Sequence, residues 1–84
     1  MEYPQYRKSK SGNSFFKITS GHSFIELQVV GQRHFVYAIE ARTMPERHLL
    51  NDLLYDYDHH WDKITAQEFD SLLESFNVQI EHPH

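Results

Sequence analysis

The sequence predicts an α+β fold: an antiparallel sheet of three to four strands over residues 3–40, with two C-terminal helices packed on one face. Apolar and polar residues alternate through residues 23–40, which is typical of half-buried strands. Connections within residues 3–40 are too short for crossover helices, so the strands are expected to run antiparallel. Strands first and helices second is the order found in α+β proteins.

Two capping boxes support the helical half of this prediction. Thr43 precedes Glu46, and Thr65 precedes Glu68, at the spacing where each threonine hydroxyl accepts the backbone N–H three residues later and the glutamate reaches back. The predicted helices span about residues 44–57 and 66–76.

The chain is predicted to form a single α+β domain, residues 1–84, with a frayed tail at residues 81–84. It has no cysteine, which excludes disulfides and thiolate metal sites. No apolar run approaches the ~18 residues that a membrane span needs, and no signal-peptide pattern opens the chain. We therefore expect a cytoplasmic protein with no membrane partner.

The first strands are expected before residue 20. Residues 3–10 are predicted as an edge strand, because Pro4 suits only the start of a strand at an edge. A turn at residues 11–13 leads to a short second strand around residues 15–18.

The register of the hairpin in residues 23–40 depends on the loop at Gly31. A two-residue loop, residues 31–32, pairs Leu27 with Val36. A three-residue loop, residues 31–33, pairs Leu27 with Tyr37 and collects the alternating apolar residues of both strands on one face. We predict the odd-length loop, or a bulge with the same effect, because it leaves one clean apolar face.

Each predicted helix has one apolar stripe at helical spacing. The stripe of the first contains Leu49, Leu50, Leu53, Leu54 and Tyr57, and that of the second contains Phe69, Leu72, Leu73 and Phe76. Ile64 precedes the second capping box and is expected to pack on Phe69 as a hydrophobic staple. A short strand at residues 78–80 is a further expectation.

No catalytic or cofactor-binding residue is predicted. The sequence contains no nucleophile elbow, phosphate loop or dinucleotide fingerprint, and its three glycines are too few for a phosphate-cradling loop. A chain this short also encloses a substrate pocket with difficulty. We expect a protein that is not an enzyme and needs no cofactor.

Residues 56–62 are rich in metal-ligating side chains. His59, His60, Asp58 and Asp62 are the candidate ligands, since imidazole and carboxylate bind divalent zinc or nickel. Adjacent histidines usually diverge, so the favoured interpretation is a solvated loop in which Trp61 and Ile64 anchor the chain to the core.

Charge separates the two halves of the molecule. Residues 1–20 carry +3, residues 21–43 carry 0 and residues 44–84 carry −7, for a net charge of −4. The basic start interleaves rings with cations, which is an arrangement used by single-stranded nucleic-acid binders: Tyr3, Tyr6, Arg7, Lys8, Lys10, Phe15, Phe16 and Lys17. The acidic remainder argues against nucleic acid as a partner.

A protein–protein interaction module is the function that the sequence favours. The predicted uncovered sheet face keeps Phe24, Val30 and Val36 among polar residues, a mixture found at many interfaces. The expected partner is an unknown protein or a second copy of the chain. Nucleic-acid binding and metal binding at residues 56–62 are the two alternatives.

Overall fold

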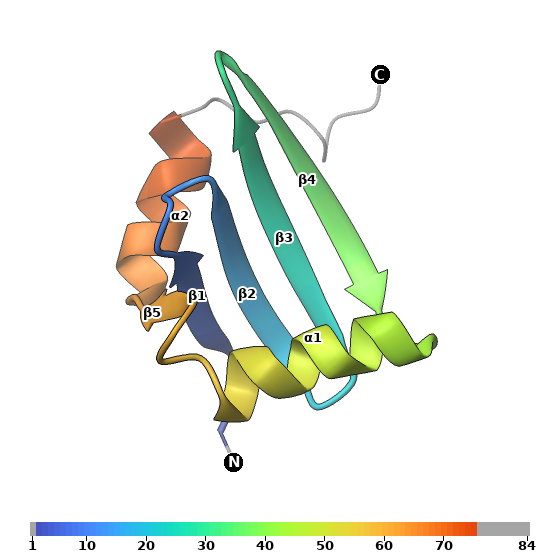
Figure 1. Ribbon diagram of the computed structural model, residues 1–84. Coiled ribbons are helices and arrows are strands. Elements are labelled where there is room, and N and C mark those ends of the chain that lie inside the picture. Colours follow the sequence, from blue (N-terminus) through green and yellow to red (C-terminus); the bar gives the residue numbers. More distant parts are fainter. Residues whose placement is uncertain (1, 76–84) are drawn as a thin grey trace.

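The structure, a computed structural model, describes residues 2–75 (Figure 1). Its elements in chain order are β1 (Gln5–Ser9), β2 (Ser14–Ser20), β3 (Ser23–Val30), β4 (Arg33–Glu40), α1 (Met44–Tyr55), β5 (Trp61–Lys63) and α2 (Ala66–Ser75). The strands form one antiparallel sheet in the order β4-β3-β2-β1-β5. The predicted α+β class is confirmed, with five strands within the described residues instead of three to four.

β5 is the strand that the sequence analysis missed, and it changes which strands lie at the edges. Trp61 and Lys63 pair with Ser9 and Arg7 on the outer side of β1. β1 is therefore an interior strand, and its predicted edge position is wrong. Three residues between two helices are too short to produce a periodic signal, so the segment read as a loop.

The β3–β4 hairpin has a two-residue loop, so the predicted odd-length loop is wrong. Val30 pairs with Arg33 and Leu27 with Val36, so the loop is the two-residue turn at residues 31–32. Gly31 has a φ of 63°, a left-handed conformation that two-residue hairpin turns require and that glycine adopts without strain. The geometry of the turn therefore determines the register. The preference for one clean apolar face, on which the prediction was based, does not.

The two helices cover opposite faces of the sheet, so the prediction that both pack on one face is wrong. Phe15 and Phe16 are neighbours in β2 and point to opposite sides, yet they are only 9% and 4% exposed. Both faces are therefore apolar and both need cover. The chain crosses from one face to the other by way of β5 at the edge (Figure 1).

One face, here named the α1 face, packs against α1. Its cluster joins sheet residues to the predicted leucine stripe of α1: Phe16, Ile18, Phe24, Ala41, Leu50, Leu53 and Leu54, with Ile39, Leu49 and Trp61 at the margin. The expected anchoring role of Trp61 is confirmed, since its ring meets that of Phe16 edge-on with centroids 6.4 Å apart.

The other face, the α2 face, packs against α2. Tyr6, Phe15, Leu27 and Phe69 form its buried cluster, bordered by Val29, Val36, Ile64, Leu72 and Leu73. The rings of Tyr6 and Phe69 lie 5.5 Å apart. Ile64 joins the same cluster as Phe69, as the predicted staple requires. Phe76, residues 78–80 and the tail at 81–84 lie outside the described residues.

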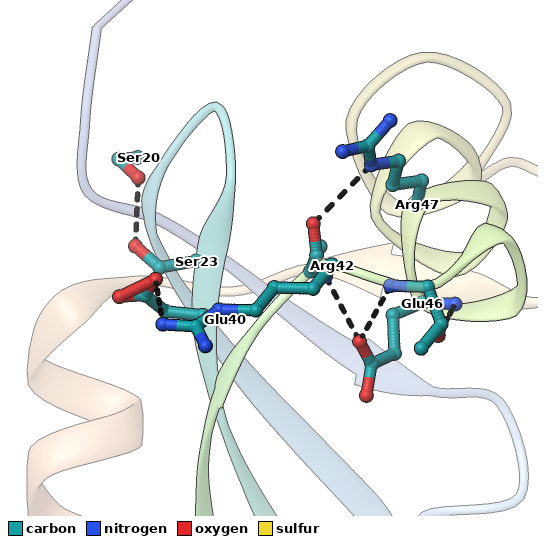
Figure 2. A network of polar contacts seen from close by, with 8 residues as sticks. Ser20, Ser23, Glu40, Arg42, Glu46 and Arg47 are labelled. Carbon is teal, nitrogen blue, oxygen red and sulfur yellow. Dashed lines mark hydrogen bonds and ion pairs between the residues drawn. The ribbon is translucent and has the colours of Figure 1, made fainter.

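The start of α1 is held by the predicted capping box. Thr43 Oγ1 accepts the N–H of Glu46, and Glu46 Oε1 accepts the backbone N–H groups of Thr43 and Arg42 at 3.1 and 3.0 Å (Figure 2). These donors lower the pKa of Glu46, because they stabilise its carboxylate form. At α2, the Thr65 hydroxyl accepts the N–H of Glu68 at 3.1 Å. Both predicted helix starts are confirmed.

The end of α1 is held by Arg7 of β1. Its Nε donates to the carbonyl of Leu53 at 2.8 Å, and its two Nη groups donate to Tyr6 O and Gln5 Oε1. The guanidinium also lies 4.2 Å from the ring centroid of Tyr57. Arg7 is 2% exposed and caps a helix whose own last turn has no basic residue.

Candidate functional site

Three large apolar side chains lie exposed together on the part of the α1 face that α1 does not reach. Val30 is 53% exposed, Phe35 39% and Tyr37 43%. The pairing of Val30 with Arg33, and the alternation along β3 and β4, put all three on the side of Phe24 and Ile39. Figure 1 shows that α1 crosses only one end of these strands. We name Val30, Phe35 and Tyr37, with Glu26 beside Tyr37 and Gln28 beside Phe35, the open patch.

The rings of Phe35 and Tyr37 are pre-arranged. Their centroids are 6.5 Å apart and their planes differ by 18°, so they stack on the surface of β4. Aromatic side chains with few rotatable bonds lose little entropy when a partner covers them. The stacked pair is therefore suited to contact another surface.

Glu26 is the polar residue at the inner edge of the open patch. It pairs across the strands with Phe16 on one side and Tyr37 on the other. Burial raises the pKa of Glu26 above its ordinary value, and a hydrogen bond from Ser14 partly opposes this shift. The carboxyl group is thus partly buried, at the border between the packed and the exposed part of this face.

The sequence-predicted interface residues do not share one surface. Phe24 is 1% exposed and belongs to the cluster under α1, so it is not available to a partner. Val36 pairs with Leu27 and lies on the α2 face, half-buried against that cluster. Val30 alone of the three is exposed and remains a candidate.

The candidate metal ligands do not converge. Asp62 forms an ion pair with Lys10, with 2.7 Å between Oδ1 and Nζ. The rings of His59 and His60 lie 6.4 Å apart, and that of His60 packs edge-on against Trp61. Within residues 2–75, no group of three or more histidine, aspartate or glutamate side chains is placed to hold a metal ion. Asp58, His59 and His60 lie in the turn before β5 and Asp62 lies in β5, and the four side chains do not form a ligand set.

The basic and aromatic start of the chain does not form a stacking platform. Tyr6, Phe15 and Phe16 are buried, and they face different sides of the sheet. Arg7 is buried under α1, and Lys10 is paired with Asp62. The rings and cations that suggested nucleic-acid binding are mostly used within the fold.

A shallow depression of about 340 Å³ lies between α1 and the turn that joins β2 to β3. Its polar lining includes Tyr3, His22, Arg47 and Tyr55. Figure 2 shows Arg47 on α1, where its Nε donates to the carbonyl of Ala41 at 3.4 Å. The volume is at the low end of ligand sites, and Tyr3 and Tyr55 are 36% and 65% exposed, so the depression does not enclose a substrate.

The sequence analysis missed Phe35 and Tyr37 because it placed them under the helices. The signal that would have found them is Gly31, since glycine at the first position of a two-residue loop is typical of hairpin turns. That register sends Phe35 and Tyr37 to the face opposite Leu27.

No helix among residues 2–75 has the length and apolar character that crossing a bilayer takes.

Comparison with family models, curated proteins and solved structures found no match to this chain.

Proposed function

We propose that this protein is a non-enzymatic protein–protein interaction module that contacts its partner through the open patch. The observation that carries the proposal is the stacked Phe35–Tyr37 pair, 39% and 43% exposed beside Val30. Exposed rings that lie next to one another on a regular strand are the anchors from which interface hot spots are built.

The surroundings of the rings support an interface with another protein. Glu26 and Gln28 lie in the same cross-strand rows as Tyr37 and Phe35. Apolar anchors with a polar fringe are the usual composition of non-obligate interfaces. An exposed face of a sheet also suits a protein surface better than a small molecule, which needs a concave site.

Site-specific photo-crosslinking in cells tests this proposal. A photoreactive phenylalanine analogue at Tyr37 should give protein adducts of higher mass, because the ring lies inside the contact surface. The same analogue at Tyr55 is the matched control: this tyrosine is 65% exposed, but it lies on α1, outside the open patch.

Adducts at position 37 and none at position 55 support the proposal, and replacing Phe35 with glutamate should then abolish them. No adduct at position 37, or equal adducts at both positions, contradicts it.

A further inference from the structure

β4 is an edge strand that lacks several of the features that usually keep edges from pairing. It has eight residues, contains neither proline nor lysine, and its pairing with β3 runs without a bulge. The opposite edge, β5, has only three residues. Within residues 2–75, no strand lies beyond β4.

The hydrogen-bonding pattern of the hairpin decides which backbone groups face outward. Ala41 donates its N–H to the carbonyl of His22 at 2.8 Å, which makes this a hydrogen-bonded pair. Bonded and non-bonded pairs alternate in an antiparallel ladder, so the odd-numbered residues of β4 bond to β3. The N–H and C=O groups of Val36, Ala38 and Glu40 therefore point away from the sheet.

The polar residues at the two ends of β4 include one pair that is complementary when the strand is reversed. Arg33 and His34 stand at its start and Glu40 at its end. An antiparallel copy in which Tyr37 faces Tyr37 places His34 of each strand opposite Glu40 of the other, on the same face and at both ends of the contact. Arg33 lies on the face of Phe35 and Tyr37 and does not take part in this pair. Glu40 is exposed and also forms an ion pair with Arg42 of its own chain, with 3.2 Å between Oε1 and Nη2.

We propose that the partner is a second copy of this chain, whose β4 pairs antiparallel with this β4 around a two-fold axis near Val36 and Tyr37. The two five-stranded sheets then become one continuous sheet. This inference rests on the proposed function and names its partner.

The pairing also extends the open patch. Facing residues of an antiparallel pair lie on the same side of a sheet, so only registers centred on Val36 or on Tyr37 align the two strands over most of their length. Both registers bring the Phe35 and Tyr37 rings of the two copies together on one face. Cross-strand aromatic pairs of this kind stabilise a sheet.

Symmetry favours this contact over a head-to-tail one. Pairing β4 of one copy with β5 of the next would use only three residues and would not close. Two β4 strands use the same surface twice and close as a dimer.

Ala38→Pro tests the pairing, with mass measured by sedimentation equilibrium. The substitution removes an outward N–H and places a proline ring on the outer edge, where an edge strand tolerates it. Ala38→Thr is the matched control, since it keeps the N–H and adds a β-branched side chain that strands favour. Thermal unfolding checks that both variants are folded.

We expect a dimer for the unmodified protein and for Ala38→Thr, and a folded monomer for Ala38→Pro. A monomeric unmodified protein, larger open-ended assemblies, or an Ala38→Pro variant that dimerises as well as the control overturns the inference. Position-37 adducts that contain a different protein, together with a monomeric chain, would overturn this inference and leave the proposed function standing.

Discussion

Glu26 marks the boundary between the buried core under α1 and the open patch. Its neighbour in β2, Phe16, is 4% exposed, whereas its neighbour in β4, Tyr37, is 43% exposed. The carboxylate therefore lies where cover by α1 gives way to an exposed sheet. Burial raises its pKa, so the folded protein binds this proton more tightly than the unfolded chain does.

This pKa shift predicts that Glu26→Gln raises the melting temperature at pH 7. Between the ordinary pKa of a glutamate, ~4.3, and the raised pKa in the fold, the unfolded chain ionises first, and stability falls as the pH rises. The glutamine variant avoids this loss, so its advantage should shrink as the pH falls and vanish below about pH 4.

Melting temperatures of both proteins across this pH range give the measurement. Glu74→Gln, at an exposed position of α2, is the control and should show no comparable gain. An advantage at position 26 that does not depend on pH would contradict the assigned cause.

α1 is an element whose two ends are stabilised from different sources. Its start is held locally, by the reciprocal bonds of Thr43 and Glu46. Its end depends on Arg7, which comes from β1 and donates to the carbonyl of Leu53. The local end was readable from the sequence because both partners lie within four residues. The distant one was not, because nothing near residue 53 indicates a partner 46 residues away.

Replacing Arg7 with methionine should therefore lower the free energy of unfolding by about 1.5–3 kcal/mol, which is what hydrogen bonds from a charged group contribute. The loss arises because the carbonyls of Leu53 and Tyr6 lose their donor inside the core. Chemical denaturation measures it.

Lys8→Met is the matched control, since it removes the neighbouring cation of β1 from the other side of the strand. Equal losses of unfolding free energy for the two substitutions would contradict this account. They would show that Arg7 acts only through its charge and not through its hydrogen bond to the Leu53 carbonyl of α1.

At the scale of the whole molecule, the α+β class, both helix starts and the apolar stripes could be predicted, because each depends on residues close in sequence. The distribution of the two helices over the two faces could not, since it depends on β5, a three-residue edge strand. The interface prediction failed for Phe24 because α1 covers the face on which it lies. It failed for Val36 because one residue of slip in the hairpin moves the side chains of β4 to the other face. Buried Phe15 and Phe16, adjacent in β2, are the sequence feature that points to a sheet covered on both sides.

Contacts between side-chain protons, measured by nuclear Overhauser spectroscopy, test this two-sided arrangement most directly. The account predicts cross-peaks from the Phe69 ring to Tyr6 and Leu27, and from the Leu53 methyl groups to the α1-face cluster, with none between Leu53 and Leu27. Cross-peaks that join the Leu27 and Leu53 methyl groups would place both helices on one face and would contradict the open patch itself.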